Sequence, residues 1–263
     1  FLAIGTWRAL GAGIPGEDAT RVWHAISFLE HVARAQAPKM GGRVVVVGGG
    51  NAAVDSARTA LRLGSAVTIA YRRAREDMPA IADEVEQAQA EGVELMFLAS
   101  PQRIVCDARG NVRGIELRRT RLGDYALDGR RRPVSTDETF IVECDTVILA
   151  IGERPDAEAL RRVGIHVRDD DTAAVDCVSV ETNRARVFAG GDLATGASNV
   201  SSTMATGKSA ARAIDAVLCG GDRLAGVLGE GTFAVSQRVP QTPEGGARHV
   251  SPQLTLAQCR RGD

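Results

Sequence analysis

Residues 43–73 read RVVVVGGGNAAVDSARTALRLGSAVTIAYRR, a stretch that joins an apolar run, a glycine-rich turn and a helical pattern. Four consecutive valines, Val44–Val47, are typical of a parallel strand buried on both faces, because such strands are continuously hydrophobic. Gly48, Gly50 and Ala53 then occupy the G-x-G-x-x-G/A positions of a dinucleotide-binding turn. There the first glycine allows a tight bend, the second lets backbone approach a pyrophosphate, and the small third residue keeps helix and strand close. The pattern therefore predicts a pyrophosphate site at a helix N-terminus.

The residues after this turn complete a βαβ unit. Small apolar residues recur at helical spacing from Ala53 to Leu61, and Gly64 suits the end of that helix. Val67–Tyr71 then reads as a second strand. Three glycines alone could mark an ordinary strand-to-helix turn, but strand, helix and second strand together favour a dinucleotide site. We expect the whole loop to contribute to binding: Gly48, Gly49, Gly50, Asn51, Ala52 and Ala53.

The end of the second strand bears on the choice of nucleotide. Sites that prefer NAD place an acidic residue there, about 20 residues after the glycines, to bond the ribose 2′-hydroxyl, whereas an arginine accommodates a 2′-phosphate. This sequence has Arg72 and Arg73 after Tyr71. A guanidinium presents a planar fork of donors that matches a phosphate, so the sequence predicts NADP(H) over NAD(H). The alternative is that both arginines form a solvated strand end.

Composition bounds the class of protein. The 263 residues are 44% hydrophobic, and 32 basic against 33 acidic side chains give a formal charge of −1, so nothing points to nucleic acid or to an anionic membrane. No apolar run approaches the roughly 18 residues of a membrane span, and the opening FLAIGTWRAL has no basic leader. The cysteines are odd in number and form no C-x-x-C pair, which argues against a metal or cluster site held within this chain and favours a reducing cytoplasm. They are Cys106, Cys144, Cys177, Cys219 and Cys259.

The remaining segments extend the α/β pattern. The spacing predicts a helix over 22–35 whose His24 and His31 are structural or surface histidines, not ligands. Further elements are expected as a helix beginning at Met78-Pro79, a third parallel strand over 93–98 and a returning buried strand over 146–151. Phe1–Thr6 reads as a short buried strand, and because chain ends are usually exposed we expect a longer N-terminal region before it.

An antiparallel excursion interrupts this order. Residues 103–107 and 112–119 read as a hairpin about a turn at 109–111, and 139–144 supplies another strand. A long tip is expected over 123–133, where Arg130–Arg132 could be an anion site but are better explained as a solvated loop. The whole predicts a Rossmann-like NAD(P)-binding domain with an antiparallel β excursion over 41–152.

A second glycine motif lies later in the chain. Val187–Asp192 (VFAGGD) reads as a short strand that ends in two glycines and an aspartate, and Ser202–Leu218 has the small-residue pattern of a helix. Gly191 would permit close approach of a cofactor, and the Asp192 carboxylate could accept a ribitol hydroxyl. By composition alone the same segment could be another strand–turn–helix.

Seven motifs in series give the chain a family resemblance. It resembles the small subunit of glutamate synthase and its relatives, which include the flavin subunit of electron-bifurcating ferredoxin:NADP oxidoreductases and the flavin region of dihydropyrimidine dehydrogenase. The motifs are FLAIGT, PGED, VVVVGGGNAAVD, AYRRAREDMPA, EGVELMFLASP, AIGERP and FAGGD. FAGGD with MATGKSAARAI is similar to the closing FAD motif of flavoproteins with two dinucleotide-binding domains. The resemblance runs nearly continuously from Phe1 to about Cys219 and gives out over 220–263.

The resemblance implies an NAD(P)-binding domain (41–152) inserted between segments of a partial FAD-binding domain (1–40 and 153–222), with a polar tail (223–263). NADPH would bind at the glycine loop, with Arg72 and Arg73 on its 2′-phosphate. FAD would lie near Gly191 and Asp192, and a helix N-terminus would stabilise the anionic reduced flavin. The residues assigned to that helix end are Ser202, Met204 and Ala205, and Gly152 is assigned to a crossover between the domains.

The resemblance also implies the reaction. Hydride would pass between NADPH and FAD, and electrons would continue to an iron–sulfur domain or to a large catalytic or electron-acceptor subunit. Because the cofactors carry this chemistry, no side chain is nominated as acid or base, Glu153 included. The family's first FAD fingerprint and its cysteine-rich cluster domain do not occur in this sequence, so we expect an incomplete FAD site. The alternatives are a non-catalytic NADP-binding or docking subunit and, against the missing C-x-x-C, a disulfide reductase.

Overall fold

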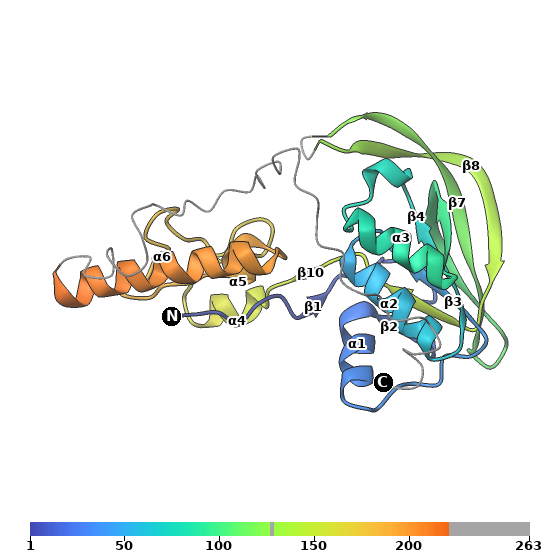
Figure 1. The fold of residues 1–263 in the computed structure, drawn as a ribbon, viewed down its shortest axis with the longest axis horizontal. Coiled ribbons are helices and arrows are strands. Elements are labelled where there is room, and N and C mark those ends of the chain that lie inside the picture. The colour runs from blue at the N-terminus through green and yellow to red at the C-terminus, as the bar shows by residue number, and fades with distance from the viewer. Residues whose placement is uncertain (127–128, 221–263) are drawn as a thin grey trace. The chain divides into compact units, whose positions relative to one another are not determined.

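A computed structural model describes residues 1–126 and 129–220, which divide into two compact units (Figure 1). One unit runs from Ala9 to Ile151. The other combines Phe1–Arg8 with the described residues from Gly152 onward. The predicted polar tail, 223–263, lies outside the described residues.

A five-stranded parallel sheet forms the centre of the Ala9–Ile151 unit. Its order is β2-β9-β3-β4-β5, and all four neighbouring pairs are parallel. The strands are β2 (Val22–His24), β3 (Arg43–Val47), β4 (Ala66–Tyr71), β5 (Glu94–Phe97) and β9 (Thr146–Leu149). The three strands predicted from 43–71 and 93–98 and the returning strand are therefore confirmed.

Both faces of this sheet are covered, as the run of valines predicts. Helices α1 (Ala25–Ala33), α2 (Asn51–Arg62) and α3 (Ala82–Glu91) cover one face, where Val44 and Val46 lie in one core cluster with residues of all three helices. Val45 and Val47 belong to a second cluster on the other face, with residues of the antiparallel sheet. Figure 1 shows the helices and the β7–β8 hairpin on opposite sides of the parallel strands. Alternation of side chains along β3 thus serves two cores.

The antiparallel excursion forms its own three-stranded sheet. Its order is β6-β7-β8, comprising β6 (Ala99–Cys106), β7 (Val112–Tyr125) and β8 (Arg131–Glu143). Pairing of β7 with β8 continues to Tyr125 and Arg131, so the strands are longer and the tip shorter than predicted. Arg131 is consequently a strand residue that pairs with Tyr125, and the expectation of a solvated loop over Arg130–Arg132 is wrong at Arg131 and Arg132, which both lie in β8.

Three boundaries differ from the predictions because backbone groups bond elsewhere. The first residues of the helix expected over 22–35 form strand β2, which pairs with β9, and α1 begins at Ala25. Accordingly, the compact unit begins at Ala9 instead of residue 41. Helix α3 begins at Ala82, after a 3-10 turn η1 (Arg75–Asp77), because the N–H groups of Ala80 and Ile81 bond to the glycine loop.

The second unit is smaller in its regular structure. It contains α4 (Ala157–Arg162), α5 (Asp192–Thr195) and α6 (Val200–Cys219), and five of its buried residues form a core cluster to which α4 and α5 contribute. Those residues are Leu160, Ile165, Ala173, Ala189 and Leu193. The two short strands at the unit boundaries, β1 (Arg8–Ala9) and β10 (Glu153–Arg154), pair with each other.

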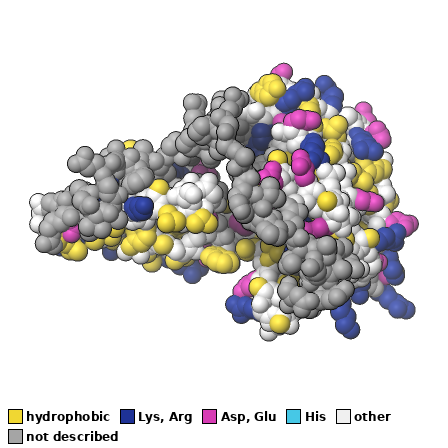
Figure 2. All heavy atoms as spheres, viewed as in Figure 1, with side chains coloured by type: hydrophobic (Ala, Val, Ile, Leu, Met, Phe, Trp, Pro, Cys, Tyr) yellow, Lys and Arg dark blue, Asp and Glu magenta, His cyan; other side chains and the backbone are white. Residues whose placement is uncertain are grey.

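The strand expected over Phe1–Thr6 does not form. Leu2 makes a single parallel bridge with Ala189, and Phe1 is 56% exposed. The segment 187–189 likewise forms no strand. Phe188 makes a single bridge with Glu181 and Ala189 makes a single bridge with Leu2, so no continuous ladder forms. Within the described residues no helix combines the length and apolarity needed to cross a membrane. Acidic and basic side chains are interspersed on the face drawn in Figure 2, in keeping with the formal charge of −1.

Candidate functional site

The glycine loop joins β3 to α2, and each of its three glycines has a distinct steric environment. Gly48 has φ +149°, and an ideal Cβ there would lie 2.1 Å from the Ala150 carbonyl oxygen. At Gly49 a Cβ would lie 2.4 Å from the ring of Tyr71. At Gly50 a Cβ would meet nothing within 4 Å. The first two glycines are therefore required by packing, whereas the third leaves open space at the helix start.

That open space lies where an anion would be favoured. Gly50 is the N-cap residue of α2 and supplies no side-chain cap. The Ala53 N–H donates to the Gly50 carbonyl at 3.0 Å, so the N–H groups of Asn51 and Ala52 are the first-turn donors that remain for a ligand. Ala53 is fully buried against the sheet, which brings the helix close to the strand as the fingerprint requires. The predicted loop residues Gly48 to Ala53 thus lie at the turn from β3 into the first turn of α2, and their contact with a pyrophosphate stays a prediction.

A segment that follows β4 folds back over this loop. The Ala80 N–H donates to the carbonyl of Gly49 at 3.2 Å, and the Ile81 N–H donates to Oδ1 of Asn51 at 3.0 Å. The hydroxyl of Tyr71 donates to the Asp77 carbonyl at 2.7 Å. Asn51, which was predicted to contact the nucleotide, therefore also holds the neighbouring segment in place.

The structure separates the two arginines at the end of β4. Arg72 is exposed, and its carbonyl accepts a hydrogen bond of 2.7 Å from the hydroxyl of Thr120 in β7. Arg73 is only 7% exposed, and its Nε donates to the carbonyl of Arg131 at 2.6 Å. Of the two predicted phosphate ligands, Arg72 lies at the surface and Arg73 is directed into the unit.

Sequence reasoning did not identify the residues that hold this turn. Asp77 accepts a hydrogen bond from the Arg131 N–H through Oδ1 at 3.1 Å, and Leu98 donates to the Arg73 carbonyl at 3.1 Å. These partners come from β8 and from the turn between β5 and β6. The one available signal was the basic run at Arg130–Arg132, but nothing in it indicates proximity to Arg73.

The second glycine motif forms a connected polar cluster in the other unit. A Cβ at Gly190 would lie 2.9 Å from the ring of Phe1, and Gly191 has φ +64°. The Gly191 N–H donates to the hydroxyl of Thr206 at 2.7 Å. Oδ1 of Asp192 accepts from the hydroxyls of Ser198 at 2.7 Å and Thr203 at 3.3 Å. These bonds bring Gly191 and Asp192 to the start of α6, where hydroxyls of the chain itself donate to the partly buried carboxylate.

The helix that follows begins earlier than predicted. Helix α6 starts at Val200, because Asn199 caps it by accepting from the Ser202 N–H at 2.9 Å. Met204 and Ala205 consequently lie in the second turn, where backbone N–H groups are used inside the helix. Of the residues predicted to present a helix N-terminus, Ser202 lies in the first turn with its N–H bonded to Asn199, whereas Met204 and Ala205 lie beyond that turn. Val200 and Ser201 are the first two residues of the helix.

Two residues at the boundary of this unit were also singled out. Gly152 begins the unit and has a φ of +123°, a conformation that suits glycine. Burial raises the pKa of the next side chain, Glu153, by desolvating its carboxylate. The Glu153 carboxyl therefore lies in a partly apolar environment.

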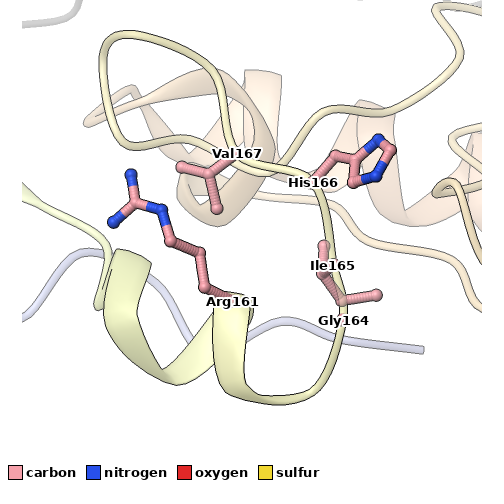
Figure 3. Close-up of a pocket in the computed structure, with 5 residues that line it drawn as sticks. All are labelled: Arg161, Gly164, Ile165, His166 and Val167. Carbon is pink, nitrogen blue, oxygen red and sulfur yellow. The ribbon is translucent and has the colours of Figure 1, made fainter.

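One surface hollow lies apart from every predicted site residue. It follows α4 and is lined by Arg161, Gly164, Ile165, His166 and Val167 (Figure 3). The carbonyl of Gly164 and the N–H of His166 both bond to the side chain of Asn183, at 2.9 and 2.8 Å. The polar backbone there is satisfied within the fold. Among the described residues, no group of three or more His, Cys, Asp or Glu side chains could hold a metal ion.

Comparisons with known proteins agree with these features. The chain is 41% identical over 223 residues to the NADP(+)-dependent formate dehydrogenase subunit beta of Moorella thermoacetica, covering 83% of this chain and 31% of the relative. It is 35% identical over 231 residues to the glutamate synthase [NADPH] small chain of Escherichia coli K12, covering 81% of this chain and 49% of the relative. The chain thus spans less than half the length of either relative.

Solved structures share the fold at low identity. Thioredoxin reductase of T. acidophilum superposes with a TM-score of 0.63 at 20% identity, covering 82% of this chain and 64% of that one. Mycobacterium tuberculosis FprA in complex with NADPH gives 0.61 at 20% identity, covering 82% and 61%. These likenesses confirm the predicted fold class, a mixed α/β flavoprotein fold with a parallel sheet. The sequence model of the pyridine nucleotide-disulphide oxidoreductase family matches residues 1–215, so the chain belongs to this family.

Proposed function

We propose that this chain is the NADP(H)-binding part of a flavin-dependent oxidoreductase similar to the small subunit of glutamate synthase. Hydride passes between NADPH and FAD, and electrons continue to an iron–sulfur domain or a large partner subunit in the cytoplasm. The observation that carries the proposal is the pairing of an open helix N-terminus at Gly50 with exposed Arg72 at the end of the neighbouring strand. The names of two relatives, which include NADP(+) and NADPH, support this choice of nucleotide.

The residues of each site have separate tasks. The glycine loop and the first turn of α2 receive the pyrophosphate, and the Arg72 guanidinium pairs with the 2′-phosphate. In the other unit, Gly191 and Asp192 lie near the pyrophosphate and ribitol of FAD, and Val200 and Ser201 present the start of α6 to the flavin; the hydrogen bonds that hold Asp192 at this helix start support the assignment. Nicotinamide and flavin supply the redox chemistry when bound, so the protein's contribution is binding and orientation.

Disulfide chemistry is not part of the proposal, despite the family name. The sequence has no C-x-x-C pair. Cys144 is buried at the end of β8, and desolvation raises the pKa of its thiol to about 12. A thiol with that pKa is protonated at neutral pH and is a poor nucleophile.

A visible absorption spectrum of the purified protein tests the proposal. A flavin spectrum that bleaches when NADPH is added without oxygen supports the oxidoreductase, and NADH at the same concentration should bleach it more slowly. Colourless protein that binds NADPH, measured by calorimetry, would instead identify a non-catalytic NADP-binding or docking subunit. Protein that binds neither nucleotide would overturn both assignments.

A further inference from the structure

The backbone of Arg131 is held from two directions by residues that follow β4. Its carbonyl accepts from Nε of Arg73 at 2.6 Å, and its N–H donates to Oδ1 of Asp77 at 3.1 Å. Arg73 and Asp77 are both buried. One residue of the β7–β8 hairpin is thus fastened by both of its backbone polar groups to the segment that carries Arg72.

The side chain of Arg131 is engaged inside the hairpin. Its Nε donates to the carbonyl of Gly123 at 3.1 Å, and its Nη2 donates to the carbonyl of Leu122 at 3.2 Å. These carbonyls lie where the register of β7 and β8 shifts between Leu122 and Tyr125. Arg131 therefore joins both strands of the hairpin to the turn after β4, and its guanidinium has structural partners.

The same hairpin fixes the turn at a second point. Thr120 in β7 donates through its hydroxyl to the Arg72 carbonyl, and its N–H donates to the Leu98 carbonyl at 2.9 Å. The orientation of Arg72 consequently depends on where β7 lies. Thr120 is 48 residues from Arg72 in sequence. Release of the hairpin at Arg131 would let β7 move, and the hydrogen bond from Thr120 to the Arg72 carbonyl would then no longer hold Arg72 in place.

We infer that Arg73 is a positioning residue that ties the β7–β8 hairpin to the cofactor turn, and that Arg72 supplies the guanidinium that distinguishes NADPH from NADH. This rests on the proposed function. Arg72 is exposed, whereas Arg73 is 7% exposed and its Nε already donates to the Arg131 carbonyl. Removing the donor from a partly buried carbonyl is costly, so this hydrogen bond favours the inward position of Arg73.

Two near-isosteric substitutions separate the positioning role from direct phosphate binding. In arginine Nε is attached to Cδ, and in glutamine the amide nitrogen is attached to the same carbon. Arg73→Gln therefore keeps a donor to the Arg131 carbonyl while removing the charged end. Arg73→Met fills similar space without a donor. Dissociation constants for NADPH and NADH are measured on the full chain for both variants, together with Arg72→Met.

The expected result is a loss of NADPH preference of about tenfold in Arg73→Met, the scale of one hydrogen bond, with Arg73→Gln restoring it to within about twofold of the unsubstituted protein. Equal losses in the Gln and Met variants would overturn the inference in favour of direct binding. No loss in either variant would also overturn it. If Arg72→Met leaves the preference unchanged, the proposed nucleotide assignment fails instead, which distinguishes the two failures.

A second variant guards against misfolding of Arg73→Met. Asp77→Asn weakens the other tie to Arg131 and changes no arginine. It should lower NADPH preference in the same direction, and its effect should be less than additive with that of Arg73→Met because both act on one residue. Full additivity, or a preference unchanged in Asp77→Asn protein of native circular dichroism, would contradict a shared action through Arg131.

Discussion

The aromatic ring of Tyr71 occupies the space that a side chain at Gly49 would need, since an ideal Cβ there would lie 2.4 Å from its Cε2 atom. Tyr71 is buried, and its hydroxyl donates to the Asp77 carbonyl, so the ring cannot swing away without breaking that bond. The end of β4 and the glycine loop are therefore packed as one body. The glycine pattern consequently encodes a contact within the protein as well as room for a ligand.

Replacing Gly49 with alanine should destabilise the protein. The added methyl group must displace the Tyr71 ring, and overpacking of this kind costs about 1–3 kcal/mol. Urea unfolding measures the loss. The cost should be smaller when Tyr71 is first changed to leucine, because the shorter side chain leaves room; an equal cost in both backgrounds would show that the ring is not the obstacle.

Replacing Gly50 with alanine should affect binding and spare stability. Gly50 has φ −90° and ψ 179°, which any residue adopts, and a Cβ there would meet nothing within 4 Å. We expect unfolding free energy to change by less than about 0.5 kcal/mol. NADPH and NADH should both bind more weakly, by about 1–3 kcal/mol, because the methyl group takes space beside their common pyrophosphate. Calorimetric titration with each nucleotide provides the check; unchanged affinities would remove the pyrophosphate from this position.

Replacing Arg72 with alanine should weaken NADPH binding by about 1–3 kcal/mol and leave NADH nearly unaffected. The lost charge pair is exposed, so the difference between the nucleotides should also shrink as salt is raised in the unsubstituted protein. Arg34→Ala is a matched control, since Arg34 is an exposed arginine of the same unit that pairs with Glu30 at 2.7 Å. Similar losses for both nucleotides would argue against a 2′-phosphate contact.

Alkaline pH should reduce stability through Cys144. Its pKa is raised from 9.0 to about 12 by burial, so between these values the unfolded chain releases a proton that the folded protein keeps. The contribution is fully present below pH 9 and is lost as pH rises toward 12, by at most about 1.4 kcal/mol per pH unit. Unfolding free energies at pH 8 and pH 10 should differ less in Cys144→Ala than in the unsubstituted protein. An identical difference in the two proteins would assign the pH dependence to other groups.

Local pattern predicted the central part of the fold well. The run Val44–Val47, the glycine turn and the end of α2 at Gly64 all depend on neighbours within a few residues, and the structure has each of them. Elements whose partners lie far away were predicted less well. Val22–His24 has a helical pattern but pairs with Val147–Leu149 as a strand, because β9 offers an open edge that the local sequence cannot reveal.

The start of α6 illustrates a different limit. The small-residue pattern of Ser202–Leu218 identified the helix, but the cap at Asn199 added residues that carry no periodic signal. Because the first N–H groups of a helix are the ones that face a ligand, a shift of two residues changes which positions form that end. The small-residue pattern therefore predicted the helix α6 but did not predict the residue at which it begins.

The sequence by itself determined the dinucleotide-type βαβ unit, its glycine loop and the presence of two arginines after β4, because these follow from short-range periodicity and residue chemistry. Only the tertiary structure distinguished the two arginines. Arg73 is buried, and its Nε donates a hydrogen bond to the carbonyl of Arg131, 58 residues away, whereas Arg72 is exposed. The physical reason is that burial depends on which distant segments pack against a residue. Two adjacent arginines have the same local sequence pattern, so the sequence does not show which of them such a segment will cover.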